Sequence, residues 1–313
     1  MAIALVFPGQ GSQAVGMGEE LYGAHASARA VFAEVDAALG ENLSELMFNG
    51  PLERLTLTEN AQPALMAAAL AVVRVLEEKG LRLADKVACV AGHSLGEYSA
   101  LAAAGALSIA DAARLLRTRG RAMQAAVPPG QGAMAALLGV GKDVAEQLAA
   151  EAAQGEVCEL ANDNEETQAV ISGSAAAIDR AGGLAKAHGV RRFLPLNVSA
   201  PFHCALMRPA AEVMDKALAK VALRRPAVPL IANVLAAPIS DPDEIRRCLV
   251  AGVVGTVRWR ECVTAMAAAG VTDLYEIGPG KVLAGLARRI SPALKASSIS
   301  TPEDIEAAAG ALT

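Results

Sequence analysis

The pattern with the clearest chemical meaning is Gly92-His93-Ser94-Leu95-Gly96, which matches G-x-S-x-G. In a nucleophile elbow of this form, a strand turns sharply into a helix and exposes a serine hydroxyl. A tight structural turn is the alternative, but an apolar strand at 87–91 enters the motif and a small-residue helix at 95–104 leaves it. Glycines permit such a cramped turn, and the N–H of Leu95 at the helix start can face a developing oxyanion. The segment therefore predicts that Ser94 is a nucleophile.

A serine hydroxyl needs a base that takes its proton, and the chain has four histidines. His25 lies in a polar helical stretch and His188 ends a predicted helix. The side chain of His93 should point away from the neighbouring serine. His203 differs because it ends the loop 199–203, where the chain returns from an inserted module, and a residue at that crossover can face the elbow across a cleft. We predict that His203 is the base.

Two glycine-rich segments resemble nucleotide-binding motifs but lack the partners those motifs need. Residues 9–14 read Gly-x-Gly-x-x-Ala, yet a dinucleotide fingerprint requires an acidic residue about 20 positions further on, at the end of a second strand. Glu34 and Asp36 lie in a helical pattern instead. Residues 278–281 lack the spacing and the Ser/Thr of a phosphate-binding P-loop. Neither segment predicts a nucleotide site.

Strand and helix signals alternate through the first 125 or so residues, which predicts an α/β fold with a parallel sheet covered by helices. A Pro-Pro-Gly break at 128–130 follows, and the order then becomes β-α-β-β-α-β, as in ferredoxin-like modules. At 313 residues, one large domain and a smaller one are expected. We predict a large domain from 1–127 and 199–313, interrupted by a small domain at 128–198.

The predicted elements are assigned from hydrophobic periodicity and turn residues. The strands are 3–7, 87–91, 133–138, 156–161, 168–172, 190–196, 228–233 and 273–277. The helices are 61–78, 95–104, 111–125, 142–153, 175–188, 206–220, 243–250, 259–269 and 282–290. The tail from Ser297 onward is interpreted as a short, dispensable helix or a mobile end.

Composition narrows the class of protein. The net charge of −5, with no long basic run, argues against nucleic acid as the main partner. Five scattered cysteines without a C-x-x-C spacing indicate reduced thiols in the cytoplasm, and the chain shows no short Cys/His/carboxylate cluster for a metal. The first residues resemble a strand rather than a signal peptide, and the longest apolar stretch, 64–73, is too short for a membrane span.

Together these pieces resemble the malonyl-CoA:acyl carrier protein transacylases of bacterial fatty acid synthesis, over nearly the whole length. The landmarks are Phe7-Pro8-Gly9-Gln10-Gly11-Ser12-Gln13, Gly92-His93-Ser94-Leu95-Gly96-Glu97-Tyr98, Arg119-Gly120-Arg121-Ala122-Met123-Gln124, Gly132-Ala133-Met134, Ala161-Asn162-Asp163-Asn164, Val170-Ile171-Ser172-Gly173, Pro201-Phe202-His203-Cys204 and Glu276-Ile277-Gly278-Pro279-Gly280-Lys281-Val282-Leu283. The resemblance implies an α/β-hydrolase-like large domain with a ferredoxin-like insert, in agreement with the element order.

The resemblance also implies roles for particular residues. Ser94 would carry the acyl group and His203 would act as base and acid. Gln10, with the N–H of Leu95, would form the oxyanion hole. Arg119 would hold the free carboxylate of malonate at the far end of the pocket, since a guanidinium grips a carboxylate with two parallel hydrogen bonds.

Sequence alone does not distinguish Arg119 from Arg114, Arg117 and Arg121, because a solvated helix face explains any one of them.

Three further positions follow from the same resemblance. Asn162 and Phe202 would contact the substrate, and Phe202 would narrow the pocket against α-branched acyl groups, although a core aromatic is the alternative. In the family a backbone carbonyl orients the histidine, commonly from a glutamine position. Here that position is Gly252, whose carbonyl remains available while the side chain is lost.

The implied activity is a two-step transfer of malonyl from coenzyme A to the phosphopantetheine thiol of acyl carrier protein, by a cytoplasmic monomer without a cofactor. A discrete acyltransferase of a polyketide synthase or malonate decarboxylase system, a serine thioesterase or hydrolase, and a non-catalytic carrier-binding scaffold remain alternatives. The residue pairs 191–192 and 288–289, all arginine, are candidate contacts for an acidic carrier, although paired arginines are usually only solvated.

Overall fold

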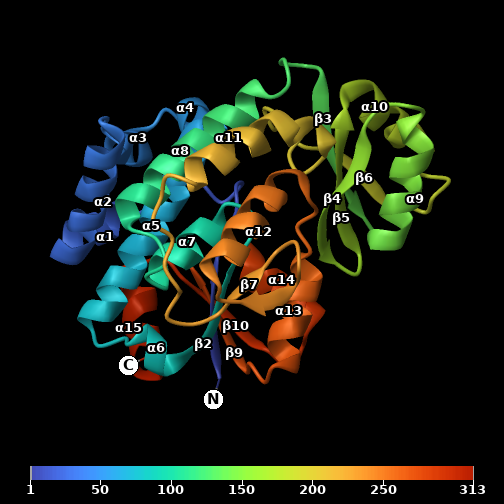
Figure 1. The fold of residues 1–313 in the computed structure, drawn as a ribbon. Helices are drawn as coiled ribbons and strands as arrows, with labels where there is room; N and C mark the ends of the chain where they lie inside the picture. The colour runs from blue at the N-terminus through green and yellow to red at the C-terminus, as the bar shows by residue number, and fades with distance from the viewer. Residues whose placement is uncertain (1, 313) are drawn as a thin grey trace.

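The large sheet lies at the centre of the computed structural model, which describes residues 2–312 (Figure 1). Its strands are β1 (Ile3–Phe7), β2 (Val87–Gly92), β7 (Leu230–Ala232), β8 (Ala237–Ile239), β9 (Asp273–Ile277) and β10 (Lys295–Ile299). They lie in the order β10-β9-β1-β2-β7-β8, and every neighbouring pair is parallel except β7 with β8. The predicted α/β fold with a mainly parallel sheet is confirmed.

Both faces of this sheet are buried, as β1 shows. Ile3, Leu5 and Phe7 belong to one apolar core, and Ala4 and Val6 belong to another on the opposite face. This alternation follows from the two-residue period of a strand. Because helices cover both sides, the strand is apolar at every position rather than at every second one.

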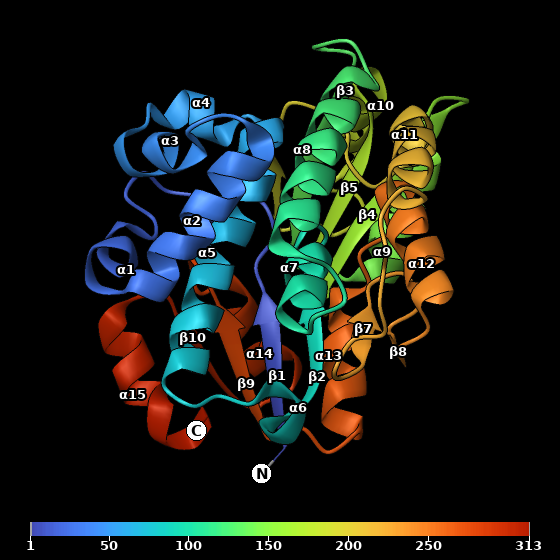
Figure 2. The same ribbon diagram turned by 60° about the vertical axis from the view of Figure 1, so that its left-hand side comes forward.

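The helices divide between the two faces, with α5 and α7 in front of the sheet in Figure 2. The larger core is lined by α1 (Glu19–Ala24), α2 (Ala26–Leu39), α3 (Leu43–Asn49), α4 (Leu52–Thr56), α5 (Thr58–Glu78), α6 (Leu83–Lys86), α7 (Gly96–Ala103), α8 (Ile109–Ala125), η1 (Ala205–Met207), α11 (Arg208–Leu218), α12 (Pro242–Val254) and α15 (Pro302–Leu312). The smaller core is lined by α13 (Trp259–Ala268) and α14 (Val282–Ile290).

A second sheet stands apart from the first and carries its own helices and core (Figure 1). Its elements are β3 (Gly132–Leu138), α9 (Lys142–Ala153), β4 (Cys158–Glu165), β5 (Gln168–Ser174), α10 (Ala175–Leu184) and β6 (Arg192–Pro195). The four strands lie in the order β4-β5-β3-β6, and all neighbours are antiparallel. The predicted order of elements between 133 and 196 is therefore present, although α10 ends four residues earlier than expected.

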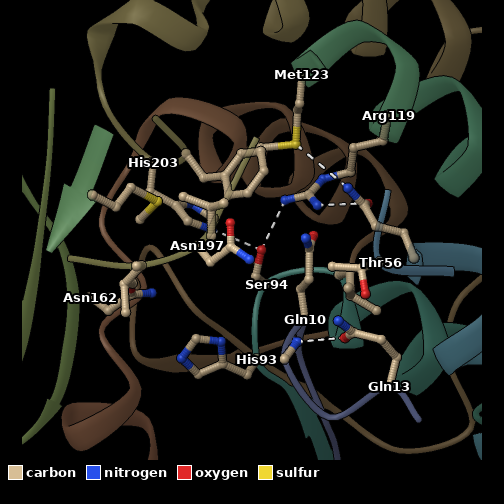
Figure 3. A pocket seen from close by; sticks show the side chains of 17 residues that line it. Gln10, Gln13, Thr56, His93, Ser94, Arg119, Met123, Asn162, Asn197 and His203 are labelled. Atoms are coloured by element: carbon tan, nitrogen blue, oxygen red, sulfur yellow. Dashed lines mark hydrogen bonds between the residues drawn. The ribbon is translucent and has the colours of Figure 1, made fainter. Parts of the chain in front are cut away.

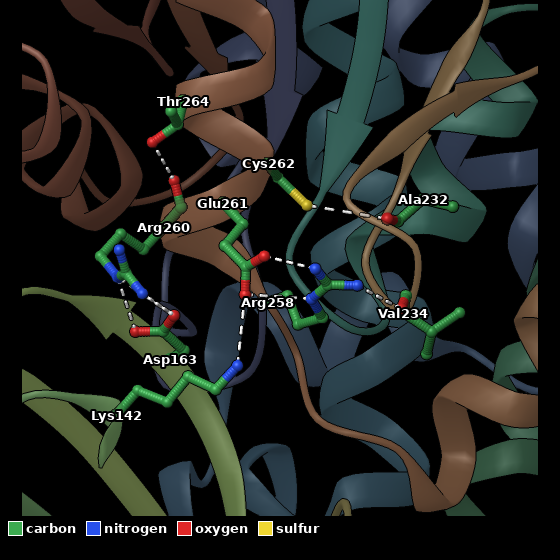
Figure 4. A network of polar contacts seen from close by, with 9 residues as sticks. All are labelled: Lys142, Asp163, Ala232, Val234, Arg258, Arg260, Glu261, Cys262 and Thr264. Carbon is green, nitrogen blue, oxygen red and sulfur yellow. Dashed lines mark hydrogen bonds and ion pairs between the residues drawn. The ribbon is translucent and has the colours of Figure 1, made fainter. Parts of the chain in front are cut away.

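The two sheets meet where β4 passes the segment before α13. The backbone N–H of Asp163 donates to the carbonyl of Val257 at 3.0 Å, and the N–H of Val257 donates to the carbonyl of Ala161 at 2.9 Å. Arg260 of α13 grips the fully buried Asp163 carboxylate, with Nε 3.0 Å from Oδ1 and Nη2 2.9 Å from Oδ2 (Figure 4). Short backbone pairing and a two-pronged ion pair thus fix one sheet against the other.

The tail from Ser297 onward contains a helix, α15, as one of the two interpretations expected, but it also completes a strand and packs into the core. β10 pairs with β9 along the edge of the large sheet, so Ser297 lies within a strand. In α15, the side chains of Ile305 and Leu312 are fully buried in the larger core. Seen alone, Lys295–Ile299 lacks a strong strand signal because it holds Lys and two Ser, and its position beside β9 determines its conformation.

The search for membrane spans among residues 2–312 finds no helix with the length and apolar character needed to cross a bilayer.

Candidate functional site

Ser94 lies at the corner between β2 and α7, in a turn that only small residues permit. A Cβ at Gly92 would lie 1.9 Å from the carbonyl carbon of Gly96, and a Cβ at Gly96 would lie 2.3 Å from the carbonyl oxygen of Phe7. Ser94 itself has φ 54°, a left-handed conformation that non-glycine residues rarely adopt. This turn lifts the hydroxyl above the carboxyl edge of the sheet.

His203 meets the serine from the loop between β6 and η1, as Figure 3 shows: its Nε2 lies 2.8 Å from Ser94 Oγ. Its Nδ1 faces two backbone carbonyls, those of Gly252 at 2.9 Å and Gly255 at 3.2 Å. Because a carbonyl only accepts, Nδ1 carries the proton and Nε2 is left to accept the serine proton.

The carbonyls come from the end of α12, where helical carbonyls lack helical partners. The negative end of that helix favours an imidazolium whenever one forms.

The resting imidazole is neutral. Burial, together with the positive charge of Arg119, lowers the pKa of His203 to about 3, although the two carbonyls oppose the shift. A histidine at 5% exposure with an acceptor nitrogen directed at a hydroxyl has the geometry of a general base.

Arg119 lies on the serine hydroxyl and not at the far end of the pocket, so that expectation was wrong. Its Nη2 donates to Ser94 Oγ at 3.0 Å, and its Nη1 donates to Oε1 of Gln62 at 2.8 Å (Figure 3). The guanidinium is buried at 3% exposure, stands over the Tyr98 ring at 5.9 Å, and its Nε has no hydrogen-bond partner. Burial lowers the pKa of Arg119 below its ordinary value, and the site therefore holds a cation that is partly unsatisfied.

The other predicted site residues surround a cavity of about 290 Å³ into which Ser94 opens. Gln10, Leu95, Asn162 and Phe202 all line it. The N–H of Leu95 donates no hydrogen bond to any part of the chain that the structure describes, so it is free to meet a ligand. Gly252 contributes only its carbonyl, and a side chain built there would first meet Glu97 at 3.7 Å.

The remaining histidines lie elsewhere or make other contacts. His25 lies half-buried between α1 and α2, and His188 lies 2.8 Å from Glu151 at the surface. His93 lines the cavity, but its Nε2 lies 3.0 Å from Oδ1 of Asn164, and burial lowers its pKa. Within residues 2–312, no three His, Cys, Asp or Glu side chains form a group that could hold a metal ion.

Sequence reasoning missed Asn233, which supports the elbow from the neighbouring strand. Its Oδ1 accepts the N–H of Ser94, its Nδ2 donates to the carbonyl of Gly92, and its own N–H donates to Oε1 of Glu97, each at 2.8 Å. Burial raises the pKa of Glu97 to about 7, with Asn233 and Arg119 opposing. A polar residue directly after β7, at the carboxyl edge of a parallel sheet, is the signal that could have found Asn233.

Gln62 and Thr58 were missed too. Both are buried on α5 and are joined through the Gln62 amide, which donates to the Thr58 hydroxyl at 3.0 Å. The apolar pattern of this helix conceals them, because it predicts only core packing.

Comparison with known proteins places this geometry in a family. The acyl transferase domain family matches residues 4–300. The malonyl CoA-acyl carrier protein transacylase of Escherichia coli K12 is 46% identical over 305 residues, covering 97% of this chain and 98% of its own length. The enzyme of the same name from Bacillus subtilis strain 168 is 45% identical over 307 residues, covering 98% of this chain and 96% of its own length.

Solved structures agree with the sequence comparison. An acyl-carrier-protein S-malonyltransferase from Bartonella henselae superimposes with a TM-score of 0.98 at 54% identity, covering 100% of this chain and 99% of its own. A malonyl-transacylase in complex with a type II polyketide synthase acyl-carrier protein gives a TM-score of 0.96 at 41% identity, covering 99% of each chain. The chain therefore belongs to the acyl transferase family, among the bacterial malonyl-CoA:acyl carrier protein transacylases.

Proposed function

We propose that the chain transfers malonyl from malonyl-CoA to the phosphopantetheine thiol of acyl carrier protein for fatty acid synthesis, through an ester on Ser94. The observation that carries this proposal is that one hydroxyl contacts both a base and a cation: Ser94 Oγ lies 2.8 Å from His203 Nε2 and 3.0 Å from Arg119 Nη2. A hydrolase of neutral acyl chains has no use for a buried cation beside its nucleophile. Malonyl thioesters carry a carboxylate one methylene from the reacting carbonyl carbon.

In the first half of the reaction, His203 Nε2 takes the hydroxyl proton while Ser94 Oγ bonds to the thioester carbonyl carbon. The Leu95 N–H and Gln10 stabilise the resulting oxyanion. When the carbonyl re-forms, the C–S bond breaks, and the imidazolium gives its proton to the departing coenzyme A sulfur. In the second half, the carrier thiol gives its proton to His203 and its sulfur attacks the malonyl ester. As the bond from Ser94 Oγ to the acyl carbon breaks, the His203 imidazolium returns the proton to Ser94. No step calls on a cofactor.

Arg119 is proposed to hold the malonyl carboxylate through its Nε and Nη2 edge. Nη1 is occupied by Gln62, whereas within residues 2–312 Nε has no hydrogen-bond partner and Nη2 bonds only to Ser94. A carboxylate that takes both of these donors releases the serine oxygen from the guanidinium and leaves it bonded to His203 alone. Substrate binding thereby frees the nucleophile and satisfies a buried donor.

Phe202, which lines the cavity at 8% exposure, is proposed to narrow it against α-branched acyl groups, and Asn162 lines the same cavity.

The finer description of the domains is part of the proposal. We place a ferredoxin-like small domain at 128–198, inserted in an α/β-hydrolase-like large domain formed by 1–127 and 199–313. The strand order β4-β5-β3-β6, with α9 and α10 on its own core, supports the small domain. The nucleophile elbow supports the large one.

The setting of the reaction is also proposed. All five cysteines are free, which suits a reducing compartment such as the cytoplasm. The catalytic groups come from one chain, so a monomer suffices. For docking the acidic carrier, Arg191 and Arg192 are exposed, whereas Arg288 donates to a backbone carbonyl and Arg289 is paired with Glu165 at 3.2 Å. The first pair is therefore the better candidate.

Intact-protein mass spectrometry after mixing with malonyl-CoA or acetyl-CoA tests the proposal. The unmodified protein should gain one malonyl group on Ser94 and pass it to added holo acyl carrier protein, while Ser94→Ala gains none. Arg119→Ala should acylate Ser94 with malonyl no faster than with acetyl. Malonate released into water in place of transfer would instead indicate a hydrolase, and undiminished malonyl preference in Arg119→Ala would remove the clamp.

A further inference from the structure

A series of buried hydrogen bonds connects Arg119 to Gln10 through two residues of α5. Arg119 Nη1 donates to Gln62 Oε1 at 2.8 Å, and Gln62 Nε2 donates to Thr58 Oγ1 at 3.0 Å. Thr58 Oγ1 in turn donates to Gln10 Oε1 at 2.8 Å. Gln62 and Thr58 lie one helical turn apart, at 1% and 0% exposure, so water does not compete for the bond between them or for the bond from Arg119 to Gln62.

The guanidinium determines the direction of every bond in this series. Arginine has donors only, so the atom of Gln62 that faces it must be the carbonyl oxygen. The Gln62 amide nitrogen then faces Thr58 and uses the hydroxyl as an acceptor. The hydroxyl proton of Thr58 remains available, and it is donated to Oε1 of Gln10.

The last member of the series therefore presents its NH₂ group and not its oxygen to the cavity. Gln10 Nε2 has no acceptor among residues 2–312, and the side chain extends into the cavity that Ser94 and Arg119 also line (Figure 3). A carboxamide without such a partner can rotate by half a turn at little cost, because its oxygen and nitrogen ends have nearly the same shape. A rotated Gln10 would direct an oxygen at a developing oxyanion and repel it.

We propose that Thr58 is a positioning residue, which acts through Gln10 by holding the carboxamide with its NH₂ toward the reacting acyl group. This inference rests on the proposed function. It also connects the two parts of the site. Arg119, which recognises the malonyl carboxylate, orients the Gln10 carboxamide through Gln62 and Thr58, so that its NH₂ group faces the acyl oxygen.

Thr58→Val tests the proposal because valine keeps the shape and removes the hydroxyl. One oxyanion donor contributes about 10²–10³ in rate, and a misoriented one loses part of that, so we expect about a tenfold slower malonylation of Ser94 in single-turnover experiments. Thr58→Ser, which keeps the hydroxyl, should restore the rate to within about twofold. The matched control is Thr264→Val, the same change at an exposed position of α13, which should leave the rate unchanged.

A double-variant cycle separates positioning from simple support of the fold. If Thr58 acts through Gln10, Thr58→Val should slow malonylation about tenfold in the original protein but less than about twofold when Gln10→Ala is already present. An equal loss in both backgrounds, or no loss at all from Thr58→Val, would overturn the inference. Absence of a malonyl adduct on the unmodified protein would overturn the proposed function itself, and the two failures are thereby distinguished.

Discussion

At the scale of single residues, both neighbours of the serine hydroxyl favour its deprotonation. Arg119 donates to Ser94 Oγ and would favour the alkoxide, while the neutral imidazole of His203 accepts its proton. The same positive charge disfavours a protonated His203. A substrate carboxylate on Arg119 offsets that charge, so the base becomes a better proton acceptor once malonyl is bound.

The lowered pKa of His203 predicts an unusual pH profile. An ordinary histidine has a pKa near 6.5, and a base of that kind loses activity as the pH falls below it. With its pKa at about 3, His203 stays neutral throughout the mildly acidic range. We expect kcat/KM for Ser94 malonylation, which reports the free enzyme, to stay nearly constant between about pH 8 and pH 5.

Rapid-quench acylation at each pH is the measurement, with circular dichroism to verify that the protein is folded. An acid limb with its midpoint near 6.5 would contradict the assigned environment of His203.

The lowered pKa of His203 should also make the free energy of unfolding depend on pH, with stability decreasing as the pH falls. Because the folded pKa of His203 lies below the unfolded value, the unfolded chain binds the proton more readily. This contribution to stability is complete above about pH 6.5 and decreases as the pH falls toward 3.

Part of the site could be predicted from residue types in the sequence, and the rest became visible only through contacts in the structure. The elbow motif identified Ser94, and the return from the insert identified His203, which the structure brings within 2.8 Å of each other. Arg119 needed the family resemblance, because three nearby arginines have the same local pattern. Thr58 could not be found by pattern, since it matters through a contact with Gln10, 48 positions away.

At the scale of elements, local pattern located the cores of most strands and helices from α5 to α14, but it gave no bounds for α1 to α4 and missed α6, β8 and β10. α5 begins at Thr58 rather than at 61, so Pro63 lies inside the helix and not in its first turn. A proline inside a helix normally signals a boundary, and burial of this helix on all sides outweighs that signal. The edge strand β10 was missed because its polar residues give only a weak strand signal.

The elbow also yields a prediction at this scale, because its two glycines lie against backbone. A Cβ at Gly92 would lie 1.9 Å from the carbonyl carbon of Gly96, so Gly92→Ala must move α7 away from β2. We expect a loss of more than about 2 kcal/mol in the free energy of unfolding, measured by urea denaturation.

Gly183→Ala is the matched control. Gly183 lies in α10, and an added Cβ meets no atom within 4 Å, so alanine should be neutral or stabilise by up to about 1 kcal/mol. Equal stability of the two variants would contradict the account of the elbow.

At the scale of the whole molecule, the site exists only while the two sheets keep their relative placement. Ser94 belongs to the large sheet, whereas Met134 and Asn162, on the opposite wall of the cavity, belong to strands of the small one. The two units are joined by the ion pair of Arg260 and Asp163, beside the backbone bonds around Val257 (Figure 4). The surrounding charges, Arg258, Glu261 and Lys142, extend this contact on its exposed side.

Removal of the arginine from that contact should therefore affect both stability and catalysis. Asp163 is fully buried, so Arg260→Met leaves an unpaired carboxylate in the interior and should cost about 3 kcal/mol in the free energy of unfolding. Arg74→Met, which removes an exposed i,i+3 pair with Glu77, should change it by less than about 0.5 kcal/mol. Removing both charges with Arg260→Met and Asp163→Asn should recover most of the loss, since the amide does not carry a buried charge.

Catalysis distinguishes a contact that places the sheets from one that only stabilises them. If this pair fixes the small sheet against the large one, Arg260→Met should raise KM for malonyl-CoA at temperatures where the protein remains folded, because the cavity walls lose their spacing. The double variant should recover stability more completely than KM, since it restores neutrality but not the two-pronged bond. A KM unchanged in both variants would mean that the contacts other than this ion pair are sufficient to hold the sheets in place.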